Sequence, residues 1–538
     1  MTSHPAPPDA EGTRETAGPR PGASEEHVPH ARLWTGRLLG PALGVLVYLA
    51  SSQDPALSTD AAMTLGVAVL IAVWWMTEAL PLAVTSLMPL LLFPALGIFD
   101  IDQATSQYGD KIVFLFLGGF IIALAMEKWN LHKRIALLTM SAIGSKPRQL
   151  LLGIMIATWF LSMWVSNTAT TMMMLPIGVS VLTMVAGEKL SHLPADRRPT
   201  DEDDPVTALS GDRDTRNFAI SVMLGIAFAA TIGGLGTLIG SPPNLVMVGV
   251  LEDQFDTTVS FADWMKLGVP LSLVFLVVAW LMLSRVIFPT TMKDAMGGRD
   301  VVREELRTLG RMSRGEWSVL AVFVSTALLW IFLGQLQSID WLVAALPFVA
   351  GLNDTSVAMA AAVALFLIPV SAKDGVQAMD WKTAQRGVPW GVLLLFGGGL
   401  CLAAAMSETG VSDWIGQRME GLGVLPTVLL VAAVCLLTLL LTELTSNTAT
   451  STTFLPVFAG FAVAIGVDPM LLMVPAAMAA TCSFMLPVGT PPNAIVYGSG
   501  YVTMPQMVKA GVWLNLIGVV LITGMTMLLG GWAMGLEV

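Results

Sequence analysis

A short polar segment interrupts an otherwise apolar stretch twice in this chain, with the same five letters each time. The segment SNTAT at 166–170 recurs at 446–450, a separation of 280 residues (446 minus 166). Each copy lies inside a long apolar stretch, 149–187 or 425–465. Lipid offers no hydrogen-bond partners, so irregular backbone at membrane depth must be buried in protein or line a cavity. The repeat therefore limits the chain to folds in which protein surrounds both interruptions.

The composition indicates that the surrounding solvent is lipid. The chain is 54% hydrophobic and only 12% charged, whereas a soluble globular protein has about 25% charged residues. Its mean hydropathy is +0.72. We therefore expect an all-α polytopic membrane protein whose surroundings are the lipid bilayer. The formal net charge of −11, without a large basic face, argues against a nucleic-acid partner.

Membrane spans are predicted from apolar stretches, which need roughly 20 residues to cross the bilayer. The expected spans are 38–52, 61–80, 82–99, 112–127, 264–287, 317–335, 355–370, 390–406 and 510–534. The stretch 341–352 is apolar but too short to be assigned as a span. Arg32 and Arg37 precede the first span and predict a cytoplasmic N-terminus, because basic loops stay in the cytoplasm. The expected location is the plasma (inner) membrane, multi-pass, with the C-terminus outside.

The chain divides into a tail, a first span and two related halves. Pro, Gly, Ala, Glu and Ser dominate the start of the chain, which predicts a disordered cytoplasmic tail. The predicted boundaries are 1–35 for this tail, 36–60 for the first span, 61–290 for repeat 1, 291–316 for a cytoplasmic linker and 317–538 for repeat 2. Each repeat is expected to hold a re-entrant hairpin (149–187; 425–465) and a helix broken by a Pro-Pro pair (217–250; 469–499).

The two halves match in sequence but differ in their flanking charges. LFLGG at 115–119 matches LFGGG at 395–399, again 280 residues apart, and SPPN at 241–244 matches TPPN at 490–493. Basic residues flank the first hairpin, whereas acidic or neutral residues flank the second. The two hairpins are therefore expected to enter from opposite sides. Such inverted repeats with broken helices predict a binding site near the middle of the bilayer.

The four interruptions offer neutral hydrogen-bonding groups. They contain hydroxyls and amides but no Arg, Lys or His. Helix N-termini at an interruption present free N–H groups that suit a carboxylate. Helix C-termini and unwound carbonyls suit sodium. Two matched tips would each hold one carboxylate of a dicarboxylate, and bound sodium would balance the substrate charge in place of an arginine.

Two acidic residues, Glu78 and Glu443, lie at membrane depth by sequence. Such residues are functional candidates, and the alternative is a carboxylate buried in hydrogen bonds to nearby backbone. The sequence supports both interpretations equally. His132 is expected in a charged loop. The cysteines are expected to be small buried core residues rather than disulfides or metal ligands: Cys401, Cys435 and Cys482.

The repeated motifs resemble those of the divalent anion/sodium symporter family of di- and tricarboxylate transporters. The stretches that carry the resemblance are LSMWVSNTATTMMMLP (161–176), TIGGLGTLIGSPPN (231–244), LTELTSNTATSTTFLP (441–456) and FMLPVGTPPNAIVY (484–497). The resemblance implies about eleven transmembrane helices plus two re-entrant hairpins in two inverted-topology repeats. It also implies a homodimer in which a transport domain moves against a fixed scaffold domain, as an elevator does.

The resemblance also implies the site residues. Sodium site 1 would use Ser162, Ser166, Asn167 and Gly240, and sodium site 2 would use Thr442, Ser446, Asn447 and Gly489. The substrate would contact Ser166, Asn167, Thr168, Ser446, Asn447, Thr448, Thr490 and Pro491. Many family members have alanine where this chain has Gly489. Na+ would be the coupling ion, and no organic cofactor is expected.

The leading hypothesis is sodium-coupled symport of C4-dicarboxylates such as succinate, malate or fumarate. One alternative is a sodium-independent dicarboxylate/2-oxoglutarate exchanger of the same fold, and another is a citrate or sulfate transporter. An enzyme is not expected, because the interruptions hold neither a nucleophile–base pair nor a cluster of metal ligands. The leading hypothesis thus makes the partners a small dicarboxylate anion, the bilayer and a second copy of the chain.

Overall fold

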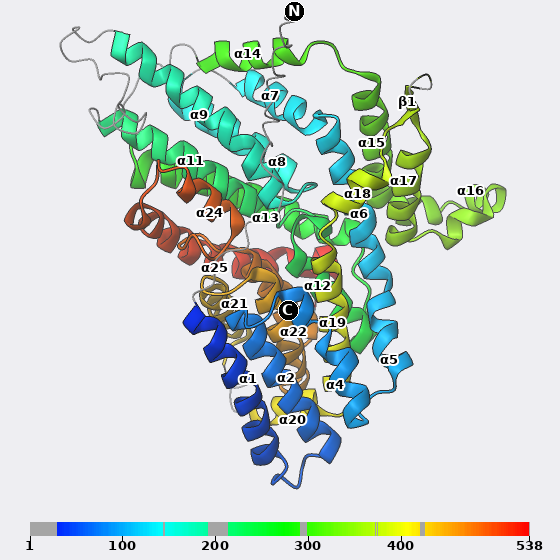
Figure 1. Ribbon diagram of the computed structural model, residues 1–538. Helices are drawn as coiled ribbons and strands as arrows, with labels where there is room; N and C mark the ends of the chain where they lie inside the picture. The colour runs from blue at the N-terminus through cyan, green and yellow to red at the C-terminus, as the bar shows by residue number, and fades with distance from the viewer. Residues whose placement is uncertain are drawn as a thin grey trace, which may run out of the picture.

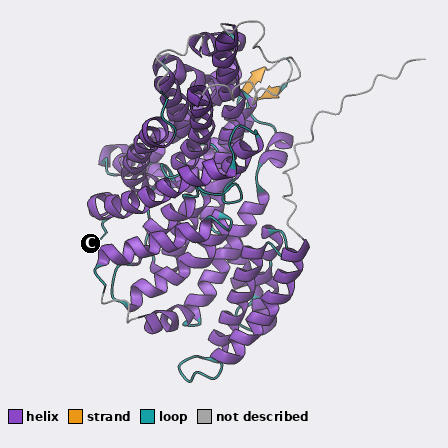
Figure 2. Cartoon of the chain, turned by 90° about the vertical axis from the view of Figure 1, so that its left-hand side faces the viewer, coloured by secondary structure: helices purple, strands orange, loops and turns teal. Residues whose placement is uncertain are grey.

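The computed structural model describes residues 30–143, 146–191, 213–290, 298–371, 373, 375–419 and 425–536. These residues are almost entirely helical. The exception is an antiparallel pair of short strands, β1 (Pro369–Ser371) and β2 (Val376–Gln377), drawn in orange in Figure 2. The all-α prediction therefore needs this small correction. Most of the predicted tail lies outside the described residues, but a helix already begins at His30, so the predicted tail boundary at 35 is wrong.

The first half contains twelve numbered α-helices that the structure describes. They are α1 (His30–Ser51), α2 (Thr59–Thr77), α3 (Leu82–Thr85), α4 (Met88–Leu96), α5 (Ile101–Ser106), α6 (Lys111–Lys128), α7 (Leu131–Ile143), α8 (Pro147–Ser162), α9 (Asn167–Ser191), α11 (Arg213–Gly233), α12 (Pro242–Phe255) and α13 (Phe261–Leu281). Short 3₁₀ turns lie at Gln107–Gly109 and Leu238–Gly240, and a π-helical turn at Met282–Ile287 extends α13.

The second half continues in the same manner. Its helices are α14 (Gly298–Leu309), α15 (Arg314–Gln337), α16 (Asp340–Ala345), α17 (Asp354–Leu367), α18 (Trp381–Gly387), α19 (Trp390–Glu408), α20 (Val411–Met419), α21 (Thr427–Thr442), α22 (Asn447–Ala464), α23 (Pro469–Thr481), α24 (Pro491–Gly498) and α25 (Met504–Met534). A 3₁₀ turn at Pro347–Gly351 follows α16, so the unassigned stretch 341–352 is largely helical.

Eight helical segments in the described ranges are long and apolar enough to cross a membrane. They are Leu33–Ser51, Thr59–Thr77, Ile101–Lys128, Arg213–Gly233, Phe261–Ile287, Arg314–Gln337, Trp390–Glu408 and Met504–Met534. Shorter apolar helices add Leu82–Leu96, Asp354–Leu367, Thr427–Thr442 and Pro469–Thr481. Apart from the two short strands, the protein is therefore a helical polytopic membrane protein.

Several predicted boundaries differ from the observed ones. The predicted span 82–99 is two short helices, α3 and α4, because Pro89 has no N–H to donate across the junction. The predicted linker 291–316 contains the helix α14, and the charged segment around His132 forms the helix α7. His132 is accordingly a buried residue of α7 rather than a loop residue, and its Nδ1 lies 3.0 Å from the Met126 carbonyl oxygen.

The two halves are interleaved at the centre of the molecule. Helices α8 and α9 pack against α11 of their own half. Helix α24, which follows the second break, also packs against α9 and α11 (Figure 1). Conversely, α12, which follows the first break, packs against α22 and α23 of the second half. The second segment of each broken helix therefore packs against helices of the other half. This packing brings the two tips and the two breaks towards the centre of the molecule.

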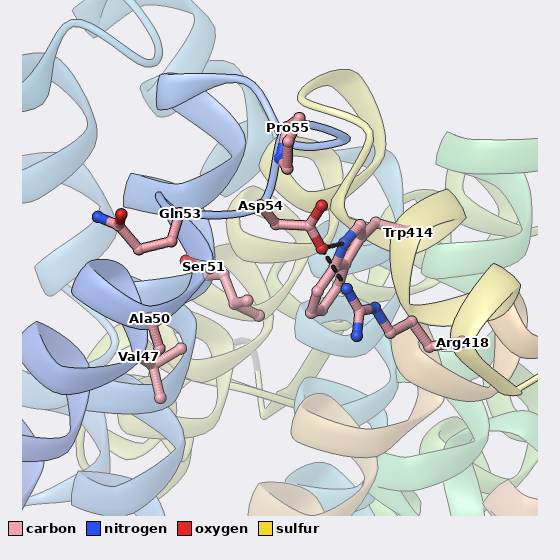
Figure 3. A pocket seen from close by; sticks show the side chains of 9 residues that line it. Val47, Ala50, Ser51, Gln53, Asp54, Pro55, Trp414 and Arg418 are labelled. Carbon is pink, nitrogen blue, oxygen red and sulfur yellow. Dashed lines mark hydrogen bonds and ion pairs between the residues drawn. The ribbon is translucent and has the colours of Figure 1, made fainter.

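Two short helices, α7 and α20, each form a polar side-chain contact with a residue distant in sequence, and the two contacts lie at equivalent positions. In α7 the Arg134 guanidinium pairs with the buried Glu316 carboxylate, Nε to Oε1 2.6 Å. In α20 the equivalent residue, 280 positions on, is Trp414, whose Nε1 donates to Asp54 Oδ2 at 3.1 Å. Arg418 pairs with the same carboxylate (Figure 3). Hydrogen bonds hold the pKa of Asp54 below its usual value, first from the backbone N–H of Ala56 and then from the side chains of Trp414 and Arg418.

A cavity of about 560 Å³ lies beside this second contact. It is lined by the end of α1, the loop after it, Leu65 of α2 and part of α20 (Figure 3). None of the residues predicted to bind sodium or substrate lines it. This cavity is therefore separate from the candidate site.

The burial of His132 predicts a pH-dependent stability. Burial lowers the pKa of His132 below its usual 6.5, against the opposing effect of its hydrogen bond to Met126 O. The folded protein thus binds this proton less readily than the unfolded chain, so stability is full above about pH 6.5 and falls as the pH drops below it. Thermal unfolding in detergent should show a lower melting temperature at pH 5.5 than at pH 7.5. The variant His132→Asn, which retains an N–H donor but does not titrate, should lose part of this difference. An equal difference in both proteins would contradict the assignment.

Candidate functional site

Both predicted hairpin tips are junctions between two helices. Helix α8 ends at Ser162 and α9 begins at Asn167, while α21 ends at Thr442 and α22 begins at Asn447. Ser162 Oγ donates to Asn167 Oδ1 at 2.6 Å. At the equivalent position Thr442 Oγ1 donates to Asn447 Oδ1 at 2.7 Å. In each half the structure therefore brings together two of the residues predicted to bind sodium.

After each break, a new helix begins at the Pro-Pro pair. The breaks run over 234–241 and 482–490, longer than the Pro-Pro motifs alone indicated. In each, the first proline is the first residue of the new helix, where its missing N–H costs nothing. The prediction of a broken helix is in this respect accurate, but the irregular backbone lies before the prolines.

In each break a buried asparagine side chain donates hydrogen bonds to two backbone carbonyl oxygens. Asn244 Nδ2 donates to the carbonyl oxygens of Gly234 and Thr237, both at 2.9 Å. Asn493 Nδ2 donates to the equivalent carbonyls, Ser483 O at 3.2 Å and Leu486 O at 3.1 Å. Both asparagines are fully buried, and the side-chain oxygen of each has no hydrogen-bond partner in the described part of the chain. Each amide therefore satisfies two carbonyls that lipid could not.

Close backbone contact assembles the first group of residues. A Cβ atom on Gly233 would lie 2.4 Å from the Trp159 carbonyl oxygen, so only glycine permits this approach of α11 to α8. A Cβ on the next residue, Gly234, would lie 3.0 Å from Asn167 Nδ2 and 3.1 Å from the Gly240 carbonyl oxygen. The Asn167 amide and the Gly240 carbonyl, both predicted to contact sodium, thus border the same glycine.

Glu443 organises the second break. Its carboxylate is 3% exposed and accepts hydrogen bonds from five neutral donors. They are Ser483 Oγ, the backbone N–H groups of Phe484, Met485 and Leu486, and Asn515 Nδ2, at 2.7–3.2 Å. Of the two interpretations of this residue, the structure therefore supports a carboxylate buried in hydrogen bonds to backbone. Glu78 instead ends α2 in a left-handed conformation, φ 52°.

This arrangement accounts for Gly489. A Cβ on Gly489 would lie 2.0 Å from Ser483 Oγ, which is closer than any contact between non-bonded atoms allows. Ser483 Oγ cannot turn away without losing its 2.9 Å hydrogen bond to Glu443. Alanine at this position would therefore force Ser483 Oγ away and break its hydrogen bond to Glu443.

A direct hydrogen bond joins the two breaks. Thr481 Oγ1, at the end of α23, donates to Ser241 Oγ, at the start of α12, at 3.0 Å. The residue equivalent to Ser241 is Thr490, whose buried hydroxyl has no hydrogen-bond partner within the described residues. Thr490, a predicted substrate contact, therefore keeps an unused hydroxyl, whereas the hydroxyl of Ser241 is occupied.

The predicted substrate residues keep different degrees of exposure. Ser166 and Pro491 are exposed, Asn167, Thr168, Ser446 and Asn447 are half-buried, and Thr448 is 8% exposed. All of them lie at the two tips or the second break. The first tip is consequently the more open of the two to a ligand.

Apart from the Glu443 carboxylate, the site is built from neutral oxygen and nitrogen atoms. No group of three or more His, Cys, Asp or Glu side chains able to hold a metal ion occurs within the described ranges. The three cysteines are free and buried, as predicted. Hydroxyl, amide and carbonyl oxygens are the ligands that suit a hard cation with little demand for geometry, such as sodium.

The sequence did not indicate the roles of two residues of this site, Ser483 and Thr481. The equivalent asparagines of SPPN and TPPN, Asn244 and Asn493, belong to the amides that the sequence offers at the breaks, but they bond to backbone carbonyls. Thr481 gave no such signal, since the equivalent residue in the first half is Ile232.

Broken helices that meet paired hairpin tips inside an apolar helical protein define a secondary transporter. The chain belongs to the family described as the sodium:sulfate symporter transmembrane region, whose model matches residues 32–536. It is thus a member of a transporter family and not an enzyme.

Curated relatives agree with this family, and solved structures show a similar fold. The chain is 42% identical to the sodium-dependent dicarboxylate transporter SdcS of Staphylococcus saprophyticus, over 94% of this chain and 92% of that protein. It is also 42% identical to SdcS of Staphylococcus aureus strain MRSA252, over 91% and 90%. The fold is similar to MtrF of Neisseria gonorrhoeae (TM-score 0.51, 10% identity, 79% and 82% covered). It is similar as well to the YdaH transporter of Alcanivorax borkumensis (TM-score 0.51, 15% identity, 80% and 86% covered).

Removing the Glu443 carboxylate should destabilise the second break. In Glu443→Met, which copies Met163 at the equivalent position of the first half, five donors lose their acceptor. A buried unsatisfied donor costs about 1–3 kcal/mol, so the melting temperature in detergent should fall well below that of the wild type. Glu443→Gln retains one acceptor oxygen and should fall less. The matched control Met163→Leu should change it little. A wild-type melting temperature for Glu443→Met would refute this role.

Proposed function

We propose that this protein is a sodium-coupled symporter of C4-dicarboxylates such as succinate, malate and fumarate. The observation that carries the proposal is the pairing of two like tips, each with the same side-chain hydrogen bond from residue 162 or 442 to the following asparagine. The curated relatives that match nearly the whole chain are named sodium-dependent dicarboxylate transporters.

The substrate would lie between the two tips. Each Ser-Asn-Thr stands at the start of a helix, α9 or α22, where free N–H groups favour a carboxylate. Two equivalent helix starts suit an anion with two like headgroups. The partnerless Thr490 hydroxyl adds a donor beside Pro491. The substrate contacts in this proposal are Ser166, Asn167, Thr168, Ser446, Asn447, Thr448, Thr490 and Pro491.

Sodium would supply the positive charge that the site residues lack. One ion would take oxygens of Ser162, Ser166, Asn167 and Gly240, and the other those of Thr442, Ser446, Asn447 and Gly489. The contact of Asn167 and Gly240 with one glycine supports the first set. Two cations would balance the two charges of the dianion, so the loaded site would cross the bilayer at a lower electrostatic cost than the anion alone.

We further propose the arrangement typical of an elevator. Two inverted repeats would supply about eleven spans and two re-entrant hairpins, with the N-terminus cytoplasmic and the C-terminus outside the inner membrane, in a homodimer. The tips and broken helices would form the moving unit. Contacts such as Lys111 with Glu252, and Gln254 Nε2 with Ala403 O at 2.9 Å, join α12 to α6 and α19 and would break during this movement.

Uptake into proteoliposomes tests the proposed coupling and substrate class. Labelled succinate should accumulate with an inward sodium gradient and not with an equimolar potassium gradient. Unlabelled malate and fumarate should compete, and sulfate and citrate should compete less. The family description names sulfate, so stronger competition by sulfate would reassign the substrate. Uptake that needs an internal dicarboxylate and ignores sodium would identify an exchanger.

Single substitutions test the two tips. Asn167→Ala and Asn447→Ala should each abolish sodium-driven uptake, because each removes an amide from a proposed sodium site, while the variants elute as folded protein on size exclusion. Asn217→Ala is a matched control, since Asn217 Nδ2 donates to Pro289 O, away from both tips. Near-normal uptake by either tip variant would remove that tip from the site.

A further inference from the structure

A continuous series of hydrogen bonds connects the second tip to the first break. Thr442 Oγ1 donates to Asn447 Oδ1 at 2.7 Å, and Asn447 Nδ2 donates to the Thr481 carbonyl oxygen at 3.3 Å. Thr481 Oγ1 in turn lies 3.0 Å from Ser241 Oγ. Ser241 directly follows Gly240. The series therefore runs from one proposed sodium site to the backbone of the other.

The groups in this series are shielded from water. Thr442 and Thr481 are fully buried, and Ser241 is 1% exposed. A hydrogen bond in such surroundings is electrostatically stronger than in water, and an unpaired partner is costly. The Thr481 hydroxyl also lies 3.3 Å from the Ala477 carbonyl oxygen in its own helix, which is a second and more distant acceptor for its single proton. A single residue, Thr481, therefore contacts both Asn447 and Ser241.

The equivalent connection is missing in the opposite direction. The counterpart of Thr481 is Ile232, and the counterpart of Ser241 is Thr490, each 249 positions away (481 minus 232; 490 minus 241). Isoleucine has no hydroxyl, and Thr490 Oγ1 accordingly has no partner. The side-chain contact between the two breaks therefore depends on Thr481 in one half only.

We propose that Thr481 is a positioning residue that couples the two sodium sites. This inference rests on the proposed function, because it takes the two sets of sodium contacts as given. Sodium at the second site orders Asn447, which holds the Thr481 carbonyl and thereby directs the Thr481 hydroxyl onto Ser241. That contact fixes the orientation of the Gly240 carbonyl, so the first site is formed when the second is filled. Coupling of this kind makes the two binding events cooperative.

The test measures succinate binding to the purified full-length protein as a function of sodium concentration. In Thr481→Val the sodium dependence should become less steep, with the Hill coefficient falling towards 1. Half-saturation should need about two- to tenfold more sodium, the range expected for one lost buried hydrogen bond. Thr481→Ser keeps the hydroxyl and should restore the wild-type curve. A loss caused only by poorer packing would not be restored in this way.

A second variant removes the other end of the contact. Ser241→Ala should reproduce the change in Hill coefficient, and the double variant should be no worse than either single one, since all three lose the same bond. Ile232→Val, at the equivalent position of the first half, is the matched control and should leave the curve unchanged.

The outcomes separate this inference from the proposed function. A wild-type curve that is steep in sodium, together with an unchanged curve in Thr481→Val and Ser241→Ala, would overturn the coupling role while leaving the symport function intact. Additive effects in the double variant would also overturn it. Wild-type binding that is indifferent to sodium would overturn the proposed function, and the coupling role with it.

Discussion

The need to satisfy broken backbone inside a membrane governs this structure. Each break frees carbonyl and N–H groups that lipid cannot pair. The protein answers with side chains that replace the missing helical partners: Asn244 and Asn493 take two carbonyls each, and the Glu443 carboxylate takes three backbone N–H groups. Only because these groups are paired can the neighbouring tips keep other polar atoms available to a ligand.

The two halves solve this shared problem with different chemistry. The asparagine clamps are the same in both, but the first half has Met163 where the second has the acidic Glu443. In the first half the Thr237 hydroxyl bonds the Met163 carbonyl oxygen instead. The two halves are therefore equivalent in their backbone but not in the side chains around it. A carboxylate accepts hydrogen bonds from the backbone of the second break, and the first break has no equivalent carboxylate at Met163.

The tips and breaks could be predicted because polar motifs recur at fixed spacing within apolar sequence, and few folds place such motifs at membrane depth. The helix starts at Asn167 and Asn447 and the Pro-Pro restarts agree with it. Helix α7 could not be recognised in the same way, since its charged side chains, Arg134 among them, are paired with residues distant in sequence. The partners of Glu443 were equally hidden, because three of the five are backbone groups that carry no sequence signal.

The contact between Ser483 and Gly489 has a consequence for how this chain can change over evolutionary time. A methyl group at 489 is blocked by the Ser483 hydroxyl, and that hydroxyl is held by Glu443. The three positions therefore constrain one another, because alanine at 489 requires Ser483 either to turn away from Glu443 or to be replaced by a smaller residue. A substitution at any one of them changes which side chains the other two can accept.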